Sequence, residues 1–308
     1  MRVVVVGATR NFFKVGHATF RVLARDRPDV RLRLAIPDIV DARRAITGIP
    51  VELFAWDPSR PTSLYPALGE CTAMLMVPPI DGRVAASRIY LDAAQRARVE
   101  YILCLGIQHS GKTAMMGLDT EEVGEMLIKS NIRHDVLRLP VFLENLLYQV
   151  KSITDRREFQ YPVGPDARFS YVTCGDLGEV FARILTDDAR KSLHNVYWTA
   201  DEPVSCGQLA HFLSRAVGAT VNFRQCASAD FVSTLRRKGM SEHAARAVLQ
   251  LWNLIDAGAE PMPTDSLRAS LGRAPTTAAQ WAVDHSCCFT PDLWEKCSHP
   301  KPPRDHMY

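Results

Sequence analysis

The sequence predicts an α/β protein with a doubly wound parallel sheet, followed by a smaller and mostly helical C-terminal lobe. Two observations predict this class. Strand-like apolar segments alternate with segments of helical periodicity from the N-terminus to about residue 140. The strand-like segments are continuously apolar rather than alternating, which is typical of parallel strands buried on both faces. With 308 residues, the chain is long enough for one such domain and a lobe.

The expected elements follow one another in a regular order. Pro28 ends the first helix, and Asp119 is the candidate cap of the last one. The expected helices cover residues 15–26, 64–70, 82–98 and 119–131. The expected strands cover residues 1–7, 30–36, 51–56, 72–79, 99–106 and 133–140.

The pattern becomes less regular after Pro140. Residues 168–187 predict a return to the sheet followed by a helix, and residues 195–200 predict a short strand. Ser205 opens a predicted helix, and two more helices follow within residues 229–258. We therefore expect three parts: a Rossmann-type NAD(P)-binding domain over 1–150, a substrate-binding lobe with strands returning to the sheet over 151–285, and a C-terminal tail over 286–308. The last residues of this tail, SHPKPPRDHMY, are rich in proline and charge and are expected to be mobile.

Composition excludes several classes of protein. The net charge is +3 with both signs interspersed, which predicts neither nucleic-acid binding nor a membrane surface. We see no signal peptide or apolar stretch long enough to cross a bilayer, so a cytoplasmic location is expected. The eight cysteines form no C-x-x-C pair and are predicted to be reduced thiols. Cys287, Cys288 and Cys297 lie near His285 and His299, but their spacing matches no standard zinc pattern, so no metal is predicted.

The segment GATRNFFKVG, residues 7–16, directly follows the first strand and predicts a dinucleotide site. A strand–turn–helix places backbone N–H groups where a pyrophosphate binds. Arg10 stands where such turns usually have a middle glycine, which lets the backbone approach the phosphates closely. The positive charges of Arg10 and Lys14 are expected to make up for the loss of this close approach. The predicted cofactor contacts in this segment are Gly7, Thr9, Arg10, Asn11, Phe12, Lys14, Val15 and Gly16.

The second and third strands end in acidic residues. Asp38 is placed to bond a ribose hydroxyl, which favours NAD, whereas Arg43 and Arg44 could meet the phosphate of NADP. The cofactor is therefore predicted as NAD(P), with NAD and NADP not distinguished. Asp57 could reach the adenine amino group or simply form a turn before Pro58.

Several stretches resemble the NmrA-like proteins, a branch of the atypical short-chain dehydrogenases: VVVVGAT, LRLPVFLENLL, FSYVTCGDLGEVFARILTD, VYWTADEPVSCGQLAHFLSRAVG and DSLRASLGRAPTTAAQWAVDH. The resemblance covers residues 1 to about 285. It implies that Val77, Pro78 and Pro79 line the ribose side of the cofactor, and that Gly106, Ile107 and His109 face the nicotinamide. It also implies that Pro140, Val141, Phe142, Glu144 and Asn145 line the nicotinamide and substrate pocket.

The chain departs from this family where proton transfer is concerned. None of its tyrosines has a lysine four residues later, and Thr120 takes the place of the lysine that many relatives keep before the sixth strand. The serine usually found after the fifth strand is also absent. His109, Lys112 and Glu121 are the remaining candidates for moving a proton.

These features predict an NAD(P)H-dependent reductase of a small, pre-activated organic substrate such as an iminium, a quinone or an enone, in a secondary-metabolite pathway. Phe231 and Trp252, in the helical lobe, are predicted to shape its pocket. Two alternatives stay open. One is a non-catalytic, NAD(P)-sensing regulator with a protein partner, and the other is a cyclisation or rearrangement catalyst that uses the same pocket.

Overall fold

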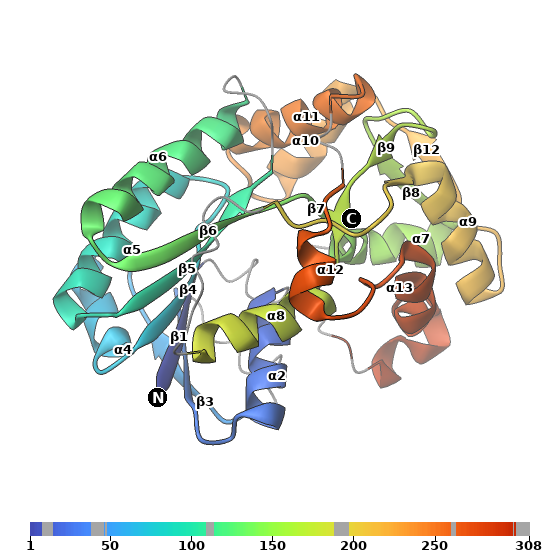
Figure 1. The fold of residues 1–308 in the computed structure, drawn as a ribbon. Coiled ribbons are helices and arrows are strands. Elements are labelled where there is room, and N and C mark those ends of the chain that lie inside the picture. The colour runs from blue at the N-terminus through green and yellow to red at the C-terminus, as the bar shows by residue number, and fades with distance from the viewer. Residues whose placement is uncertain are drawn as a thin grey trace. The chain divides into compact units, whose positions relative to one another are not determined.

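The computed structural model describes residues 1–7, 15–37, 46, 48–108, 114–187, 197–259, 263–297 and 299, without the side chains of 294–296. The chain divides into two compact units. The first comprises residues 1–107, 117–139 and 174–197, and the second comprises 108–116, 140–173 and 198–308. Each unit has its own arrangement of helices and strands (Figure 1).

The first unit is built on a six-stranded parallel sheet with the strand order β3-β2-β1-β4-β5-β6, which confirms the predicted α/β fold class. Its strands are β1 (Arg2–Gly7), β2 (Arg31–Ile36), β3 (Val51–Ala55), β4 (Ala73–Val77), β5 (Tyr101–Ile107) and β6 (Arg133–Leu139). Its helices are α2 (His17–Asp26), η2 (Pro61–Leu64), α4 (Tyr65–Leu68), α5 (Arg83–Ala97), α6 (Met115–Ser130) and α8 (Cys174–Thr186).

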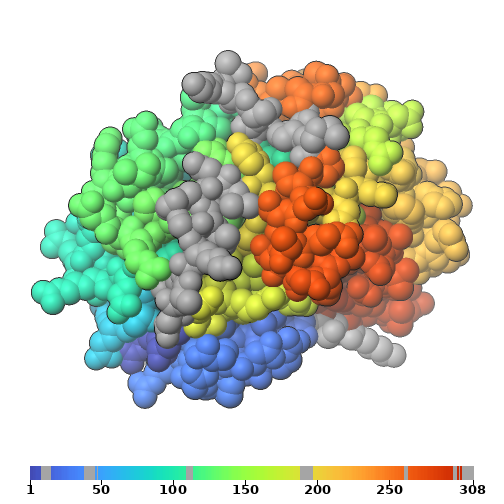
Figure 2. Space-filling model, viewed as in Figure 1, coloured from blue at the N-terminus to red at the C-terminus, as the bar shows by residue number. Residues whose placement is uncertain are grey.

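Helices cover both faces of this sheet, as continuously apolar strands require. Figure 1 shows α5 and α6 along one face and α2 and α8 along the other. On the first face, Met74, Met76 and Ile102 pack with Leu91 and Leu127 in one buried cluster. In Figure 2, α2 (blue) and α8 (yellow) lie side by side on the surface.

The second unit contains short strands and most of the remaining helices. β7 (Val141–Phe142) pairs with β10 (Tyr171–Val172), β9 (Arg168–Phe169) pairs with β11 (Val204–Ser205), and β8 (Glu158–Tyr161) pairs with β12 (Asn222–Gln225). The helices are η3 (Leu143–Gln149), α7 (Val150–Arg156), α9 (Cys206–Val217), α10 (Ser228–Arg237), α11 (Glu242–Asp256), α12 (Ser266–Leu271), α13 (Ala278–Asp284), η4 (Ser286–Phe289) and η5 (Pro291–Lys296).

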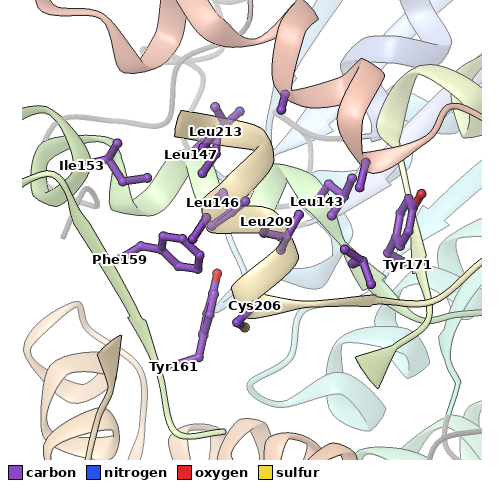
Figure 3. Close-up of a cluster of buried hydrophobic side chains, with 14 of the residues drawn as sticks. Leu143, Leu146, Leu147, Ile153, Phe159, Tyr161, Tyr171, Cys206, Leu209 and Leu213 are labelled. Atoms are coloured by element: carbon purple, nitrogen blue, oxygen red, sulfur yellow. The ribbon is translucent and has the colours of Figure 1, made fainter. Parts of the chain in front are cut away.

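The core of the second unit is a leucine and aromatic cluster around α9 (Figure 3). Leu143 and Leu147 of η3 pack with Leu209 and Leu213 of α9, and Phe159 of β8 lies in the same cluster. The helix begins as its sequence predicts, because the Ser205 side chain caps it. Ser205 Oγ accepts from the Gln208 backbone N–H at 3.2 Å, and Gln208 Oε1 accepts from the Ser205 N–H at 3.0 Å.

Two expectations differ from the structure. α6 begins at Met115, so Asp119 lies inside the helix and does not cap it; the Met115 N–H instead donates to Gln250 Oε1 at 3.0 Å, from far along the chain. The strands within residues 168–172 do not return to the six-stranded sheet, because Phe169 and Tyr171 are buried in the core of the second unit.

The C-terminal segment is described as far as residue 297, together with residue 299. Residues 286–289 and 291–296 form helical turns, and Cys288 and Phe289 are buried among the core residues of the second unit. Residues 300–308 lie outside the described part of the chain.

Candidate functional site

The candidate site lies at the carboxyl edge of the first unit's sheet, where β1 and β4 are neighbours. From β1 the chain proceeds to β2 and β3 on one side and then crosses to β4 on the other side. Neighbouring strands whose connections run in opposite directions leave a crevice at their carboxyl ends, and ligands of open α/β sheets bind in such a crevice.

Gly7 and Val77 are paired in register at this crevice. A Cβ atom on Gly7 would lie 2.6 Å from the Val77 carbonyl oxygen and 2.9 Å from Val77 Cβ. Only glycine fits at the end of β1, and the backbone there carries no side chain that would fill the crevice. Val77 and Pro78 are buried and Pro79 is half-buried.

Helix α2 follows the first loop, and the chain is already helical at Val15 and Gly16. The Thr19 hydroxyl donates to the Val15 carbonyl at 2.8 Å, within the first turn. The first-turn N–H groups of a helix bind anions, since they have no partner within the helix. Thr9, Arg10, Asn11, Phe12 and Lys14 were predicted to contact the cofactor, but they lie outside the described residues, as does Asp38.

The position of α2 depends on a close helix contact. A Cβ atom on Gly178 of α8 would lie 2.7 Å from the Ala18 carbonyl carbon and 2.8 Å from Ala18 Cβ. The glycine that lets this helix pack closely therefore lies on α8, far along the chain from the first loop.

Two side chains hold the end of β5. Arg83, at the start of α5, is buried and donates from Nη1 to the Leu105 carbonyl at 2.9 Å. Burial lowers the pKa of its guanidinium. The Ile107 N–H donates to Thr120 Oγ1 at 3.3 Å, and a Cβ atom on Gly106 would lie 2.8 Å from Thr120 Cγ2. Thr120 therefore supports the end of β5. It occupies the position at which the resemblance to NmrA-like proteins implies a lysine.

Gln108 follows Ile107 directly in the chain and was not among the predicted site residues. Its side chain is 1% exposed, and neither Nε2 nor Oε1 has a hydrogen-bond partner among the described residues. A buried amide without partners costs about 1–3 kcal/mol for each unpaired group. Such a group at a strand end indicates that a ligand or water supplies the missing bonds.

The predicted proton-transfer residues are only partly described. His109 and Lys112 lie outside the described residues. Glu121 accepts a hydrogen bond at 2.6 Å from Arg138 Nη2, and the two side chains form an ion pair in which Arg138 is 6% and Glu121 59% exposed. The Arg138 guanidinium also lies 5.9 Å from the centre of the Tyr197 ring. A structural role for Glu121 is visible, whereas its catalytic role stays a prediction.

We expect Glu121→Gln to lower the free energy of unfolding by about 1 kcal/mol, because the nearly buried Arg138 loses its counter-charge while Glu121 is half-exposed. Glu122→Gln is the matched control, since its carboxylate lies 3.8 Å from the exposed Arg88 and should cost less than about 0.5 kcal/mol. Urea unfolding measures both. Unchanged stability together with a collapse of turnover in Glu121→Gln would instead assign this carboxylate to catalysis.

Asp57 forms a turn after β3. Its carboxylate accepts from the Ser59 N–H at 2.9 Å, the Ser59 hydroxyl at 2.7 Å and Arg60 Nε at 3.1 Å. These three bonds hold the pKa of Asp57 below its usual value. The turn role is thus visible, and contact with an adenine stays a prediction.

The predicted substrate residues of the second unit are held by its own core. Glu144 is buried, and its Oε1 accepts from Trp281 Nε1 at 3.1 Å. Trp252 stacks on Tyr161 at 4.3 Å between ring centres, and Phe231 meets Tyr161 edge-on. Pro140 is buried, whereas Val141, Phe142 and Asn145 are half-buried. The contacts of Phe231 and Trp252 are those of core residues, and their role toward a substrate stays a prediction.

The first unit thus has a Rossmann-type fold with its switch point between β1 and β4. Comparisons with known proteins agree on the fold. No family model matches the chain. The chain is 23% identical to an NAD(P)H azoreductase of Xenophilus azovorans over 290 residues. The aligned residues make up 93% of this chain and 99% of the relative. It is 25% identical to quinone oxidoreductase 2 of Escherichia coli (strain K12) over 249 residues, 79% of this chain and 84% of the relative.

Two solved structures superpose on most of the chain. The NADPH-dependent quinone oxidoreductase QOR2 of Escherichia coli, complexed with NADPH, has a TM-score of 0.73 at 19% identity and covers 92% of this chain and 98% of its own. The triphenylmethane reductase of Citrobacter sp., complexed with NADP(H), has a TM-score of 0.73 at 18% identity. The match covers 92% of this chain and 99% of the reductase. At these identities the likeness shows the fold.

None of the described helices combines the length and the apolar character needed to cross a bilayer.

Proposed function

We propose that this protein is an NAD(P)H-dependent reductase of small organic substrates. The observation that carries the proposal is the switch point between β1 and β4, where Gly7 pairs with Val77 so closely that only glycine fits. The parallel sheet directs the ends of both strands to that point, and the first turn of α2 follows one loop later.

The described residues fit a dinucleotide at this edge. Gly7 allows a close approach of phosphate and ribose groups to the backbone, and Pro78 and Pro79 give β4 an end without N–H donors that would need partners. NAD(P)H, when bound, supplies a hydride, and the chain's own residues bind and orient the reactants.

The finer part of the proposal concerns the substrate. A carbonyl group needs a proton donor as it accepts hydride, and the chain has no tyrosine with a lysine four residues later. Quinones and enones need less help, since the negative charge spreads over the conjugated system, and an iminium ion needs none because hydride turns it into a neutral amine. The names of the relatives, which include an azoreductase, a quinone oxidoreductase and a triphenylmethane reductase, support this choice, as does the resemblance to NmrA-like proteins.

The test is NAD(P)H oxidation, followed by absorbance, across a panel of quinones, azo and triphenylmethane dyes, iminium salts, enones and simple ketones. We expect turnover with some conjugated acceptors and little with ketones. Brisk ketone reduction would contradict the substrate class. Silence across the panel together with tight NAD(P)H binding would favour a regulator or a non-redox catalyst.

The same assay tests His109, one of the residues that are expected to face the nicotinamide. If the substrate is pre-activated, His109→Ala should lower turnover by clearly less than the roughly 10²–10⁴-fold expected when an acid–base residue is removed. His243→Ala, an exposed histidine on α11, is the control. A loss of about 10³-fold or more in His109→Ala alone would identify a proton donor and exclude the unassisted reaction.

A further inference from the structure

We propose that Cys287, Cys297 and His299 bind a Zn²⁺ ion in the C-terminal part of the second unit. One ligand atom from each of these three residues lies within 4.8 Å of the other two. Thiolate and imidazole together are the ligands that Zn²⁺ prefers, and three protein ligands with water in the fourth position is a common arrangement. The proposal does not depend on the reductase function.

The three ligand atoms lie somewhat farther apart than they would around a bound zinc ion, as is expected before the metal binds. Ligand atoms of a tetrahedral zinc site lie about 3.5 Å apart, as follows from bonds of about 2.0–2.3 Å. Closing the triangle therefore needs movements of about 1 Å, which side-chain rotation supplies. Cys287 and His299 are only half-buried, so both can rotate and an ion can enter, whereas Cys297 is buried at 9% exposure.

The imidazole of His299 is already held as a ligand would be. Its Nε2 lies 2.9 Å from the Asp284 carbonyl oxygen. A carbonyl only accepts, so Nε2 carries the proton and Nδ1 keeps its lone pair for a metal. Histidine ligands of metals commonly donate their second ring nitrogen to such a carbonyl. The His299 ring also stacks on His285, at 4.1 Å between ring centres, and His285 stacks in turn on Trp281 at 4.3 Å.

A third sulfur supports the site from the core. Cys288 is 1% exposed, and its Sγ lies 3.1 Å from Cys297 Sγ. In the metal-bound state, this thiol can donate a hydrogen bond to the Cys297 thiolate. The zinc ion would then tie the segment after η5 to η4, because Cys287 belongs to η4 and Cys297 and His299 belong to the segment. The Asp284 carbonyl, at the end of α13, holds the same imidazole.

The principal competitor is a disulfide between Cys288 and Cys297. It would account for the short Sγ–Sγ distance, but it would leave unexplained the convergence of Cys287 and the orientation of His299. The metal accounts for these two features as well as for the position of Cys297.

The test is titration of the reduced, metal-free full chain with Co²⁺, followed by competition with Zn²⁺. Tetrahedral thiolate coordination gives Co²⁺ characteristic visible and charge-transfer bands. We expect binding of one equivalent by the wild-type chain, displaced by Zn²⁺, and at least about tenfold weaker binding in Cys297→Ser and in His299→Ala. Cys288→Ala should still bind, but about tenfold more weakly, as is typical when a supporting hydrogen bond is lost.

Cys226→Ser and His243→Ala are matched controls in the same unit and should bind as the wild type does. Because His299 is half-buried, His299→Ala should fold even if Cys297→Ser does not, and circular dichroism checks both. The proposal fails if the reduced wild-type chain gives no thiolate bands, or if His299→Ala binds Co²⁺ as tightly as the wild type. It also fails if the protein isolated from cells carries a Cys288–Cys297 disulfide and no zinc, as mass spectrometry and metal analysis would show.

Discussion

Gly7→Ala should lower the free energy of unfolding by about 3 kcal/mol, because the new methyl group would overlap the Val77 carbonyl oxygen at 2.6 Å. The oxygen is part of the backbone of a central strand, so relief requires β1 and β4 to separate at their carboxyl ends. Marginally stable domains have a total of only about 5–15 kcal/mol, so the loss is a large part of it. Urea unfolding measures the change.

Gly124→Ala is the matched control, because a Cβ atom there meets nothing within 4 Å on helix α6. It should stabilise the chain by up to about 1 kcal/mol, as an alanine does in a helix interior. If the β1–β4 crevice binds NADPH, Gly7→Ala should also weaken NADPH binding about tenfold or more under conditions where it stays folded, while Gly124→Ala should not. Equal stability of the two variants would show that Gly7 is not needed for strand packing.

Gly178→Ala is the second large effect that we expect, about 2–3 kcal/mol of destabilisation. The added methyl group would lie 2.7 Å from the Ala18 carbonyl carbon, so α2 and α8 must move apart. Gly175→Ala on the same helix is the control, since Gly175 is exposed and meets nothing within 4 Å. Differential scanning calorimetry of the two variants measures the difference between them.

A second substitution tests the cause. Ala18→Gly in the Gly178→Ala background removes the overlap with Ala18 Cβ but not the one with the Ala18 backbone. We therefore expect recovery of only part of the lost stability. Full recovery would mean that the two side chains alone set the helix distance, and a stable Gly178→Ala variant would mean that the helices tolerate separation.

The fold could be predicted from the sequence because its signals are local. The six expected strands overlap those of the sheet, since continuously apolar segments between helices have few other arrangements available. The short strands within residues 168–172 were assigned to the wrong sheet because their apolar character does not say which partner they pair with. The burial of Phe169 and Tyr171 in the second unit decides it.

The candidate site was less predictable, because its described contacts join distant parts of the chain. Gly178 allows α2 to approach from a position about 160 residues after Ala18, and no local pattern indicates this. Gln108 had no motif to mark it, and only its burial without partners singles it out. The one feature of the sequence that could have indicated Gln108 as a site residue is its position two residues after Gly106, at the end of a strand.

The C-terminal cysteines illustrate the same limit. Their spacing follows no zinc pattern, so the sequence predicted plain thiols. The helical turns after α13 bring Cys287 and Cys297 together with His299, and this convergence depends on the fold of residues 286–299 and not on spacing alone.

The most direct test of the reductase proposal uses NADPH deuterated at the transferable hydride position, together with the acceptor that the panel identifies as the best. We predict that deuterium appears in the reduced product, and that the rate of the hydride-transfer step falls with the deuterated cofactor. A product without deuterium, or no NADPH consumption with any acceptor, would contradict the account.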